Sequence, residues 1–266
     1  MISLITVCYN AKDHIGKCLQ SIAESRGCTD YEHIIIDGGS SDGTIDIIKE
    51  YACKYPNVRC QSEPDGGSSD AFNKGVRLAK GEFIGFLNAD DWYFSKTLAL
   101  VSSVARKAKN DILVFDAIYH WPDRAMRIKS NPSRMNWEMT VTHPATFIRR
   151  SLFGKIGYFD VSKKLAMDYD LLLRCLFSSS RISYFNLPVV NMAMGGISDR
   201  QWVKALWECY FSRRRMPSSP VLLQPYYLLK ILRGYASRFQ GPKWLMYSIW
   251  WFKRRFSINK AIEVSE

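Results

Sequence analysis

The sequence lacks several patterns that would assign it quickly to a class. Its seven cysteines form no Cys-x-x-Cys pair and no regular spacing, which argues against a disulfide framework and fits a reducing compartment. There is no run of about 18 uncharged apolar residues, so we expect no transmembrane helix. The opening residues MISLITVCYN have neither the basic start nor the cleavage site of a signal peptide. We therefore expect a cytoplasmic protein.

Two common phosphate-binding loops are also missing. No GxxxxGK[ST] motif occurs, and the first apolar segment is followed by Cys8-Tyr9-Asn10 instead of GxGxxG. These absences argue against a P-loop kinase and against a dinucleotide-dependent dehydrogenase. A bound diphosphate would have to be held by a metal ion in place of a glycine-rich loop.

Acidic residues are scarce only at one end of the chain. The net charge is +12, but after residue 199 there are thirteen Lys and Arg against three Asp and Glu. Aromatic and aliphatic residues lie between these basic residues, and four prolines interrupt the segment. A solvated basic face is the simplest interpretation, and nucleic-acid binding is a second. The density of Trp and Leu favours a third, contact with an anionic membrane surface.

The remaining residues predict an α/β fold with a core of ordinary size, since 47% of the chain is hydrophobic. Apolar strand-like segments alternate with amphipathic helix-like segments over the first 100 residues, which predicts a mostly parallel sheet flanked by helices. The predicted strands are 2–8, 31–36, 57–61 and 82–87, and the predicted helices are 12–25, 44–54 and 70–80. Further strands are predicted at 111–121 and 125–129, and a helix at 169–178.

Polar clusters follow these predicted strands at residues 8–10, 37–42, 65–70 and 88–91. In a parallel sheet the carboxyl ends of the strands share one edge, where ligands bind. We therefore expect the four clusters to meet. Adjacent Asp90 and Asp91 are the most telling, because Mg²⁺ and Mn²⁺ prefer carboxylate oxygens together with substrate phosphates. The simpler alternative, a cap for the next helix, is weaker beside three other polar strand ends.

Other candidate residues allow two interpretations. Ser40, Ser41 and Asp42 suffice to cap the helix after the second strand, which leaves Asp37 for a ribose hydroxyl or a base N–H. Asp70 is either a ligand or an acid favoured by its helix dipole. Asp168 is a helix cap or a general base facing the cleft. His143 is a metal ligand, a proton carrier or a buried polar residue.

Taken together, the motifs resemble the family 2 glycosyltransferases of bacterial exopolysaccharide, colanic-acid-type and O-antigen assembly. The resemblance covers roughly residues 2–195, and five motifs occur in the family's order. They are ITVCYN at 5–10, IIIDGGSSDGT at 34–44, EPDGGSSDAFNKGVRLAKGEFIGFLNADD at 63–91, HPATFIRR at 143–150, and GYFD with AMDYDLLLR within 157–174.

The resemblance implies a GT-A nucleotide-diphospho-sugar transferase domain at 1–198 and a role for each matched residue. Its nucleotide-sugar half would be 1–100, its acceptor half 101–198, and a basic helical extension would follow at 199–266. Cys8, Tyr9 and Asp37 would line the nucleoside pocket, and Asp70 would lie near it. Asp90 would face the ribose and diphosphate, and the metal residues would be Asp91 and His143, with Mg²⁺ or Mn²⁺. Asp168 would be the catalytic base. Met167 replaces the family's Glu, which leaves Asp170 as the alternative base, and Asn88 stands where an Asp is frequent.

The implied activity is inverting transfer of a sugar from a UDP- or GDP-sugar to a lipid-linked saccharide, on the cytoplasmic face of the inner membrane. No nucleic acid is expected as a partner. Two alternatives remain at this point. One is a nucleotidyltransferase on a related sheet, although the residues after the first strand form no triphosphate-binding loop. The other is a non-catalytic membrane-surface protein that works through its basic segment.

Overall fold

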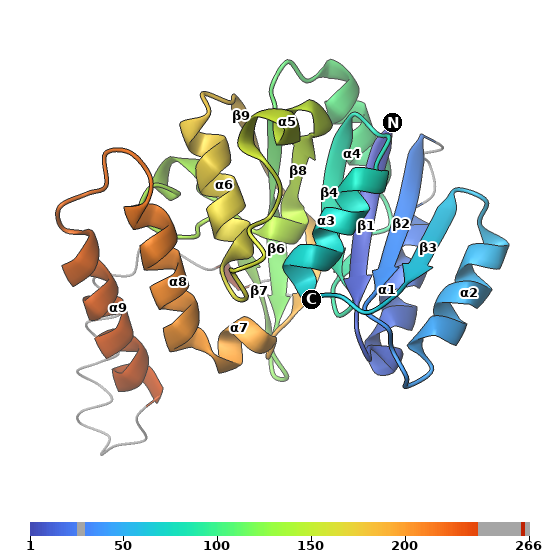
Figure 1. Cartoon of the computed structure of the whole chain (residues 1–266), viewed down its shortest axis with the longest axis horizontal. Helices are drawn as coiled ribbons and strands as arrows, with labels where there is room; N and C mark the ends of the chain where they lie inside the picture. Colours follow the sequence, from blue (N-terminus) through green and yellow to red (C-terminus); the bar gives the residue numbers. More distant parts are fainter. Residues whose placement is uncertain (26–29, 239–261, 264–266) are drawn as a thin grey trace.

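The computed structural model describes residues 1–25, 30–238 and 262–263. Its centre is a mixed sheet with the strand order β10-β7-β6-β8-β4-β1-β2-β3, joined by β5 and β9 (Figure 1). The strands are β1 (Ile2–Cys8), β2 (Tyr31–Asp37), β3 (Val58–Ser62), β4 (Phe83–Asn88), β5 (Trp92–Tyr93), β6 (Ile112–His120), β7 (Ala125–Ile128), β8 (Thr146–Arg149), β9 (Ile182–Ala193) and β10 (Ile262–Glu263).

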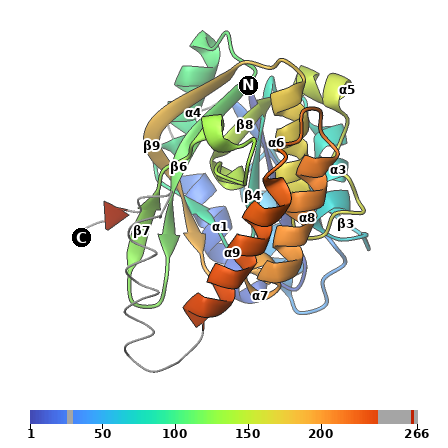
Figure 2. The ribbon, with the colours of Figure 1, turned by 90° about the vertical axis from the view of Figure 1, so that its left-hand side faces the viewer.

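Helices lie on both sides of this sheet and extend beyond it at one end (Figures 1 and 2). They are α1 (Lys12–Glu24), α2 (Thr44–Lys54), α3 (Ser68–Leu78), α4 (Thr97–Lys107), α5 (Phe153–Ile156), α6 (Met167–Phe177), α7 (Ile197–Arg200), α8 (Trp202–Arg214) and α9 (Leu223–Arg238). Short 3₁₀ turns occupy Pro132–Arg134, His143–Ala145 and Arg150–Leu152. The strands and helices predicted from the sequence are present, with ends within about two residues, the usual uncertainty of such boundaries.

The first half of the chain forms the parallel part of the sheet. Strand β1 pairs in parallel with both β2 and β4, and β2 pairs in parallel with β3. Every residue of β1 is buried, as expected where helices cover both faces of a parallel sheet. In this register Cys8 lies opposite Asp37, and Val7 lies opposite Asn88. The polar clusters that follow β1, β2 and β4 therefore meet at one edge, as the sequence predicts.

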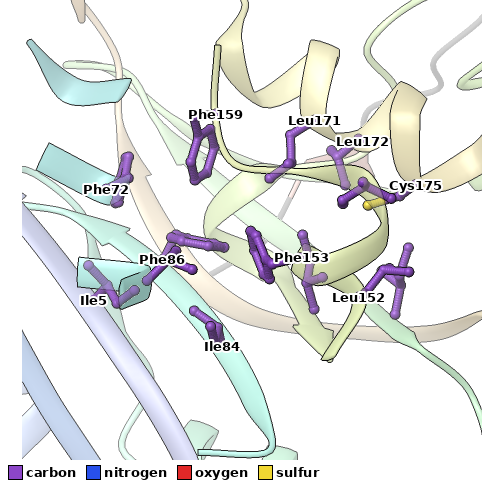
Figure 3. Close-up of a cluster of buried hydrophobic side chains, with 14 of the residues drawn as sticks. Ile5, Phe72, Ile84, Phe86, Leu152, Phe153, Phe159, Leu171, Leu172 and Cys175 are labelled. Atoms are coloured by element: carbon purple, nitrogen blue, oxygen red, sulfur yellow. The ribbon is translucent and has the colours of Figure 1, made fainter. Parts of the chain in front are cut away.

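Alternating side chains of the strands pack on the two faces of the sheet. Ile5 and Phe86 point to the face covered by α3 and α6, in one buried cluster with Phe72 and Leu172 (Figure 3). The opposite face is filled by residues such as Leu4, with α1 and α4 packed over it. This division follows from the two-residue period of a strand. The sheet is thereby fixed from both sides, and so are the loops at its edge.

The second half of the chain adds antiparallel pairs to the sheet. Strand β8 lies antiparallel between β4 and β6, and β7 forms a hairpin with β6. Strand β9 runs parallel to β6, with a register shift near Asp116, and also pairs with β5. The molecule is thus the α/β fold that the sequence predicts, with a parallel half and a mixed half.

The described helices of the basic C-terminal extension pack against the rest of the fold. Helix α8 packs against α6, and α9 packs against α8 (Figures 1 and 2). In the described part of the chain, no helix combines the length and the apolar character needed to cross a bilayer. The aromatic segment 244–252 and the basic triplet 253–255 lie outside the described residues. The six cysteines that the structure describes are all free thiols.

Candidate active site

A cavity of about 1130 Å³ opens at the edge where the strands of the parallel half end. The loops after β1, β2, β3 and β4 form one side of it. The segment before β8, the first turn of α6 and the end of β9 form the other side. Six of the predicted site residues line this cavity: Cys8, Tyr9, Asp90, Asp91, His143 and Asp168. Asp37 and Asp70 lie behind its wall.

Asp90 and Asp91 sit at the end of β4 with different surroundings. Asp91 is only 2% exposed, and its carboxylate accepts a hydrogen bond from the Asn88 amide at 3.2 Å. Burial, and then the negative charge of Asp90, raise the pKa of Asp91 well above its ordinary value. Two adjacent carboxyl groups in this position are costly to ionise together unless a cation is close. The pair is therefore a suitable place for a divalent metal ion.

Asp37 is held by its own loop. Its Oδ2 accepts hydrogen bonds from the backbone N–H of Ser40 at 2.9 Å and from the Ser62 hydroxyl at 2.6 Å. The hydroxyl of Ser40 and the thiol of Cys8 donate to Oδ1. Burial raises the pKa of Asp37, but these donors outweigh burial and lower it below its ordinary value. Asp37 is therefore ionised, and its hydrogen bonds hold the β2 loop in place. Its carboxylate oxygens are already occupied by protein donors, whereas the sequence-based interpretation left them for a ligand.

Tyr9 presents an aromatic ring at the cavity, since 66% of the residue is exposed. The following residue, Asn10, has a positive φ of 47° and accepts a hydrogen bond from the Ser41 N–H at 3.0 Å. This ties the β1 loop to the β2 loop. The Cys8 thiol is buried beneath them, and burial together with Asp37 raises its pKa far above the ordinary value. Cys8 is thus a neutral wall residue, whereas Tyr9 is free to stack on a planar ligand.

Asp70 and Asn73 on α3 support the cavity from behind. The Asp70 carboxylate accepts the backbone N–H of Gly66 at 3.1 Å, which closes the loop before α3. The side chain of Asn73 pairs with the backbone of Phe159 in both directions, at 2.9 and 2.8 Å. The two residues share one helix face, but they contact protein backbone and not the cavity.

His143 is enclosed by aromatic rings. Its imidazole stacks on Phe86 at 4.8 Å and meets Phe72 and Phe159 edge-on at 5.5 and 5.8 Å (Figure 3 shows the three phenylalanines). Burial lowers the pKa of His143 to about 3, so the ring is neutral. Among the described residues no group donates to or accepts from its Nε2. A neutral imidazole with one buried, unpaired nitrogen is compatible with a metal ligand and equally with a packing residue.

Asp168 lies in the first turn of α6 and lines the same cavity as the strand-end carboxylates. Burial raises the pKa of Asp168 to about 6. Asp170, one half-turn further, instead forms an ion pair with Arg174 at 3.0 Å and does not line the cavity. A carboxyl group with a pKa near neutrality is suited to accept a proton at physiological pH. Of the two candidate bases, the geometry favours Asp168.

Comparison with known proteins shows the family to which the chain belongs. The sequence profile described as glycosyl transferase family 2 matches residues 3–161. A PGL/p-HBAD biosynthesis glycosyltransferase of Mycobacterium bovis is 32% identical over 218 residues, which cover 77% of this chain and 84% of that protein. Chondroitin synthase of Pasteurella multocida is 28% identical over 209 residues, or 74% of this chain and 21% of that one. The chain belongs to glycosyl transferase family 2.

Solved structures agree on the fold of this family 2 glycosyltransferase. The mannosyltransferase PcManGT from Pyrobaculum calidifontis, in complex with GDP-Man and Mn²⁺, has a TM-score of 0.67 at 18% identity, covering 86% of this chain and 68% of that one. S. aureus TarS 1–349 in complex with UDP-GlcNAc has a TM-score of 0.62 at 20% identity, covering 79% and 66%. The fold is GT-A, as the sequence motifs imply. Membership of this enzyme family sets aside the nucleotidyltransferase and the non-catalytic alternatives.

The glycosyltransferase offers two carboxylates for a metal ion. No group of three or more His, Cys, Asp and Glu side chains in the described part of the chain is arranged to hold a metal by itself. Mg²⁺ and Mn²⁺ commonly bind one or two protein carboxylates and complete their shell with substrate phosphates and water. The buried Asp91, with its raised pKa and its Asp90 neighbour, fits that type of site.

Sequence reasoning missed three charged residues at the cavity of the glycosyltransferase: Asp65, Lys164 and Asp199. Asp65 lies so close to Gly38 that a side-chain carbon there would come within 2.9 Å of its carboxylate. Lys164 crosses from the loop before α6 and donates to the backbone oxygen of Gly66 at 2.6 Å. The segment EPDGG contained the signal for Asp65, because it follows β3. Nothing near Lys164 in the sequence indicated that it would reach a loop 98 residues away.

Proposed function

We propose that this enzyme is an inverting, metal-dependent glycosyltransferase that uses a nucleoside-diphosphate sugar. The observation that carries the proposal is one cavity with an acidic pair at the end of β4 and a carboxyl group of near-neutral pKa on α6. The neighbours solved with GDP-Man and Mn²⁺, and with UDP-GlcNAc, support a donor of this class. Tyr9 and the β2 loop would receive the nucleoside, with Asp37 and Asp70 holding the loops behind it.

Each half of the cavity would serve one substrate. Asp90 and Asp91 would hold Mg²⁺ or Mn²⁺ next to the donor diphosphate. His143, which the resemblance gives as a metal residue, does not form a three-ligand group with them among the described residues, so its part in metal binding is left to experiment. The ion would neutralise negative charge on the departing nucleoside diphosphate. The ring of His143, packed on Phe72 and Phe86, forms an apolar part of the cavity wall.

Asp168 would act on the acceptor. Its carboxylate takes the proton from the acceptor hydroxyl while that oxygen attacks the anomeric carbon. The bond between the anomeric carbon and the phosphate oxygen breaks, and the nucleoside diphosphate leaves with the electron pair. One displacement of this kind inverts the anomeric configuration, and it requires no covalent nucleophile.

The acceptor and the location belong to the same proposal. We place the enzyme on the cytoplasmic face of the inner membrane, with a lipid-linked saccharide as acceptor in cell-surface polysaccharide synthesis. Support comes from α9, whose outer face exposes Leu228, Leu229 and Leu232, and from the excess of basic residues after residue 199. Exposed apolar side chains beside positive charge are typical of helices that lie in the membrane interface.

The decisive experiment measures hydrolysis of UDP- and GDP-sugars by the full chain, with Mn²⁺, with Mg²⁺ and with EDTA. We expect turnover of one nucleoside class, dependent on the metal, with the released sugar of inverted configuration by NMR. Asp91→Asn and Asp168→Asn should each lose turnover by about 10²-fold or more. Turnover that survives in both variants, or a product of retained configuration, would contradict the proposal.

A further inference from the structure

The start of α6 has an unusual cap. A helix leaves its first backbone N–H groups without partners inside the helix, and a side chain at its own N-terminus commonly accepts one of them. Here the N-cap residue is Ala166, which has no side chain able to do so. The acceptor comes from a different helix, α8, in the form of Glu208.

Glu208 binds the whole segment before α6 through one oxygen. Its Oε2 accepts the backbone N–H of Lys164 at 3.2 Å, of Leu165 at 2.8 Å and of Ala166 at 3.0 Å. A carboxylate that receives several amide N–H groups forms charge-assisted hydrogen bonds, which are stronger than neutral ones. Ala166 is two residues from Asp168, so the carboxylate of Glu208 fixes the backbone from which Asp168 projects.

The segment is also held at its other sides. The Ser69 hydroxyl on α3 donates to the carbonyl of Lys163 at 2.8 Å, and the Lys164 ammonium reaches Gly66. These contacts join the segment to the loop on the nucleotide side of the cavity. Residues 163 and 164 therefore contact Ser69 and Gly66 on the strand-end side of the cavity, and the same segment leads directly into Asp168.

Helix α8 is a rigid support for Glu208. Arg213 on the same helix is fully buried, and its guanidinium donates to the backbone oxygens of Asn136 at 2.8 Å and Ser218 at 2.9 Å. It also lies over the ring of Phe177, at the end of α6, at 5.0 Å. Glu208 and Arg213 thus bind α8 to the start and to the end of α6. The position of α8 relative to Asp168 is therefore fixed at two points.

We propose that Glu208 is a positioning residue for sugar transfer: its carboxylate, supplied by the C-terminal extension, sets the place of Asp168 in the cavity. This inference rests on the proposed function, in which Asp168 is the base. It gives α8 a part in catalysis that is separate from any contact with a membrane.

The test is a kinetic comparison of Glu208→Ala with the wild-type chain, using hydrolysis of the nucleotide sugar that the donor screen identifies. Without the carboxylate, three N–H groups lose their acceptor and the segment can shift. A misplacement of about 1 Å at a catalytic group costs up to about 10²-fold, so we expect kcat to fall at least about tenfold. Affinity for UDP or GDP with Mn²⁺ should stay within about twofold, because Glu208 touches none of the strand-end loops.

The pH profile separates positioning from general loss of structure. Burial raises the pKa of Asp168 to about 6, and loosening of the segment would admit water to this carboxyl group. Hydration lowers the pKa of Asp168, so the acidic limb of kcat/KM should move to lower pH in Glu208→Ala. In a partly unfolded preparation, the maximal kcat/KM and the number of nucleotides bound per chain would fall, but the pH of the acidic limb would stay the same.

Two further variants complete the test. Glu208→Gln keeps a carbonyl oxygen for the three N–H groups and should recover kcat to within about threefold of wild type. Glu50→Ala, which removes an exposed glutamate that pairs with Lys54 on α2, is the matched control and should leave kcat unchanged. Wild-type kinetics in Glu208→Ala, or a loss with an unmoved pH limb that Gln does not recover, would overturn the positioning role. A wild-type chain inactive on every donor would instead contradict the proposed function.

Discussion

At the scale of single residues, the ionisation of Asp168 makes the sharpest prediction. A base must be deprotonated to accept a proton, and burial places the pKa of this carboxyl group at about 6. We therefore expect kcat/KM to rise with pH through about pH 6 and to level off above it. The measurement is a pH series of donor hydrolysis at saturating Mn²⁺. A limb near pH 4, the ordinary range of an aspartate, would contradict the raised pKa of Asp168.

His143 carries a second prediction at this scale. Its neutral ring stacks on Phe86, so His143→Phe keeps an aromatic ring there while removing both nitrogens. If the imidazole binds the metal, the Mn²⁺ concentration for half-maximal activity should rise at least about tenfold. The measurement is a Mn²⁺ titration of donor hydrolysis. An unchanged titration would limit His143 to packing and leave Asp90 and Asp91 as the protein's ligands.

Only part of the candidate site could be predicted from single residues in the sequence. Asp90, Asp91 and Asp168 could be proposed because each follows or begins a recognisable element. The hydrogen bonds that occupy the Asp37 carboxylate could not be predicted, because one of the donors is Ser62, 25 residues further along the chain. Glu208 gave no signal either, since it looks like any glutamate on a surface helix until α8 is placed beside α6. Hydrogen bonds between distant segments have no periodicity that a sequence can display.

At the scale of elements, apolar runs predict the parallel strands well because such strands are buried on both faces. β1 and β4 are examples, and their order also follows from the alternation with helices. The pairing of β9 is harder. This strand contains Pro188, exposes part of its length and shifts register against β6 near Asp116. Besides its buried Val189 and Val190, β9 is held by a cluster of polar contacts around the buried Asp116, which a hydrophobic pattern does not predict.

That cluster predicts how the second half of the sheet responds to mutation. Asp116 on β6 is fully buried and pairs with Arg127 on β7 at 2.6 Å, while Tyr184 on β9 donates to its other oxygen at 2.9 Å. Arg127→Ala would leave a buried carboxylate without its cation, at a cost of about 3 kcal/mol in unfolding free energy. Chemical denaturation at pH 7 measures this. Lys54→Ala, in an exposed pair on α2, is the control and should change stability little.

Arg127→Ala/Asp116→Asn should recover part of that loss, because the unpaired charge is removed with its partner. A double variant less stable than Arg127→Ala, by as much as a second broken hydrogen bond costs, would show that the unpaired charge of Asp116 is not the cause of the stability lost in Arg127→Ala.

At the scale of the whole molecule, the C-terminal extension has an inner and an outer side. Composition alone marks a boundary near residue 199, where acidic residues become scarce. The structure shows α8 packed on the catalytic part, with Arg213 buried, and α9 packed on α8 with a Lys230–Glu138 ion pair to the catalytic part. The sequence left open whether this segment packs on the core or meets a membrane. The inner helix packs on the core, which leaves the outer face of α9 for a different partner.

We expect that face to bind anionic lipid. The full chain should sediment with vesicles containing phosphatidylglycerol, less with phosphatidylcholine alone, and less as salt rises, because surface charge is screened within about 10 Å at 0.1 M salt. Leu229→Ser/Leu232→Ser, on the exposed face of α9, should weaken binding while donor hydrolysis in solution persists. Val161→Ser/Leu187→Ser, at two exposed apolar sites on other elements, is the matched control. Equal sedimentation of both double variants would show that the membrane contact does not involve α9.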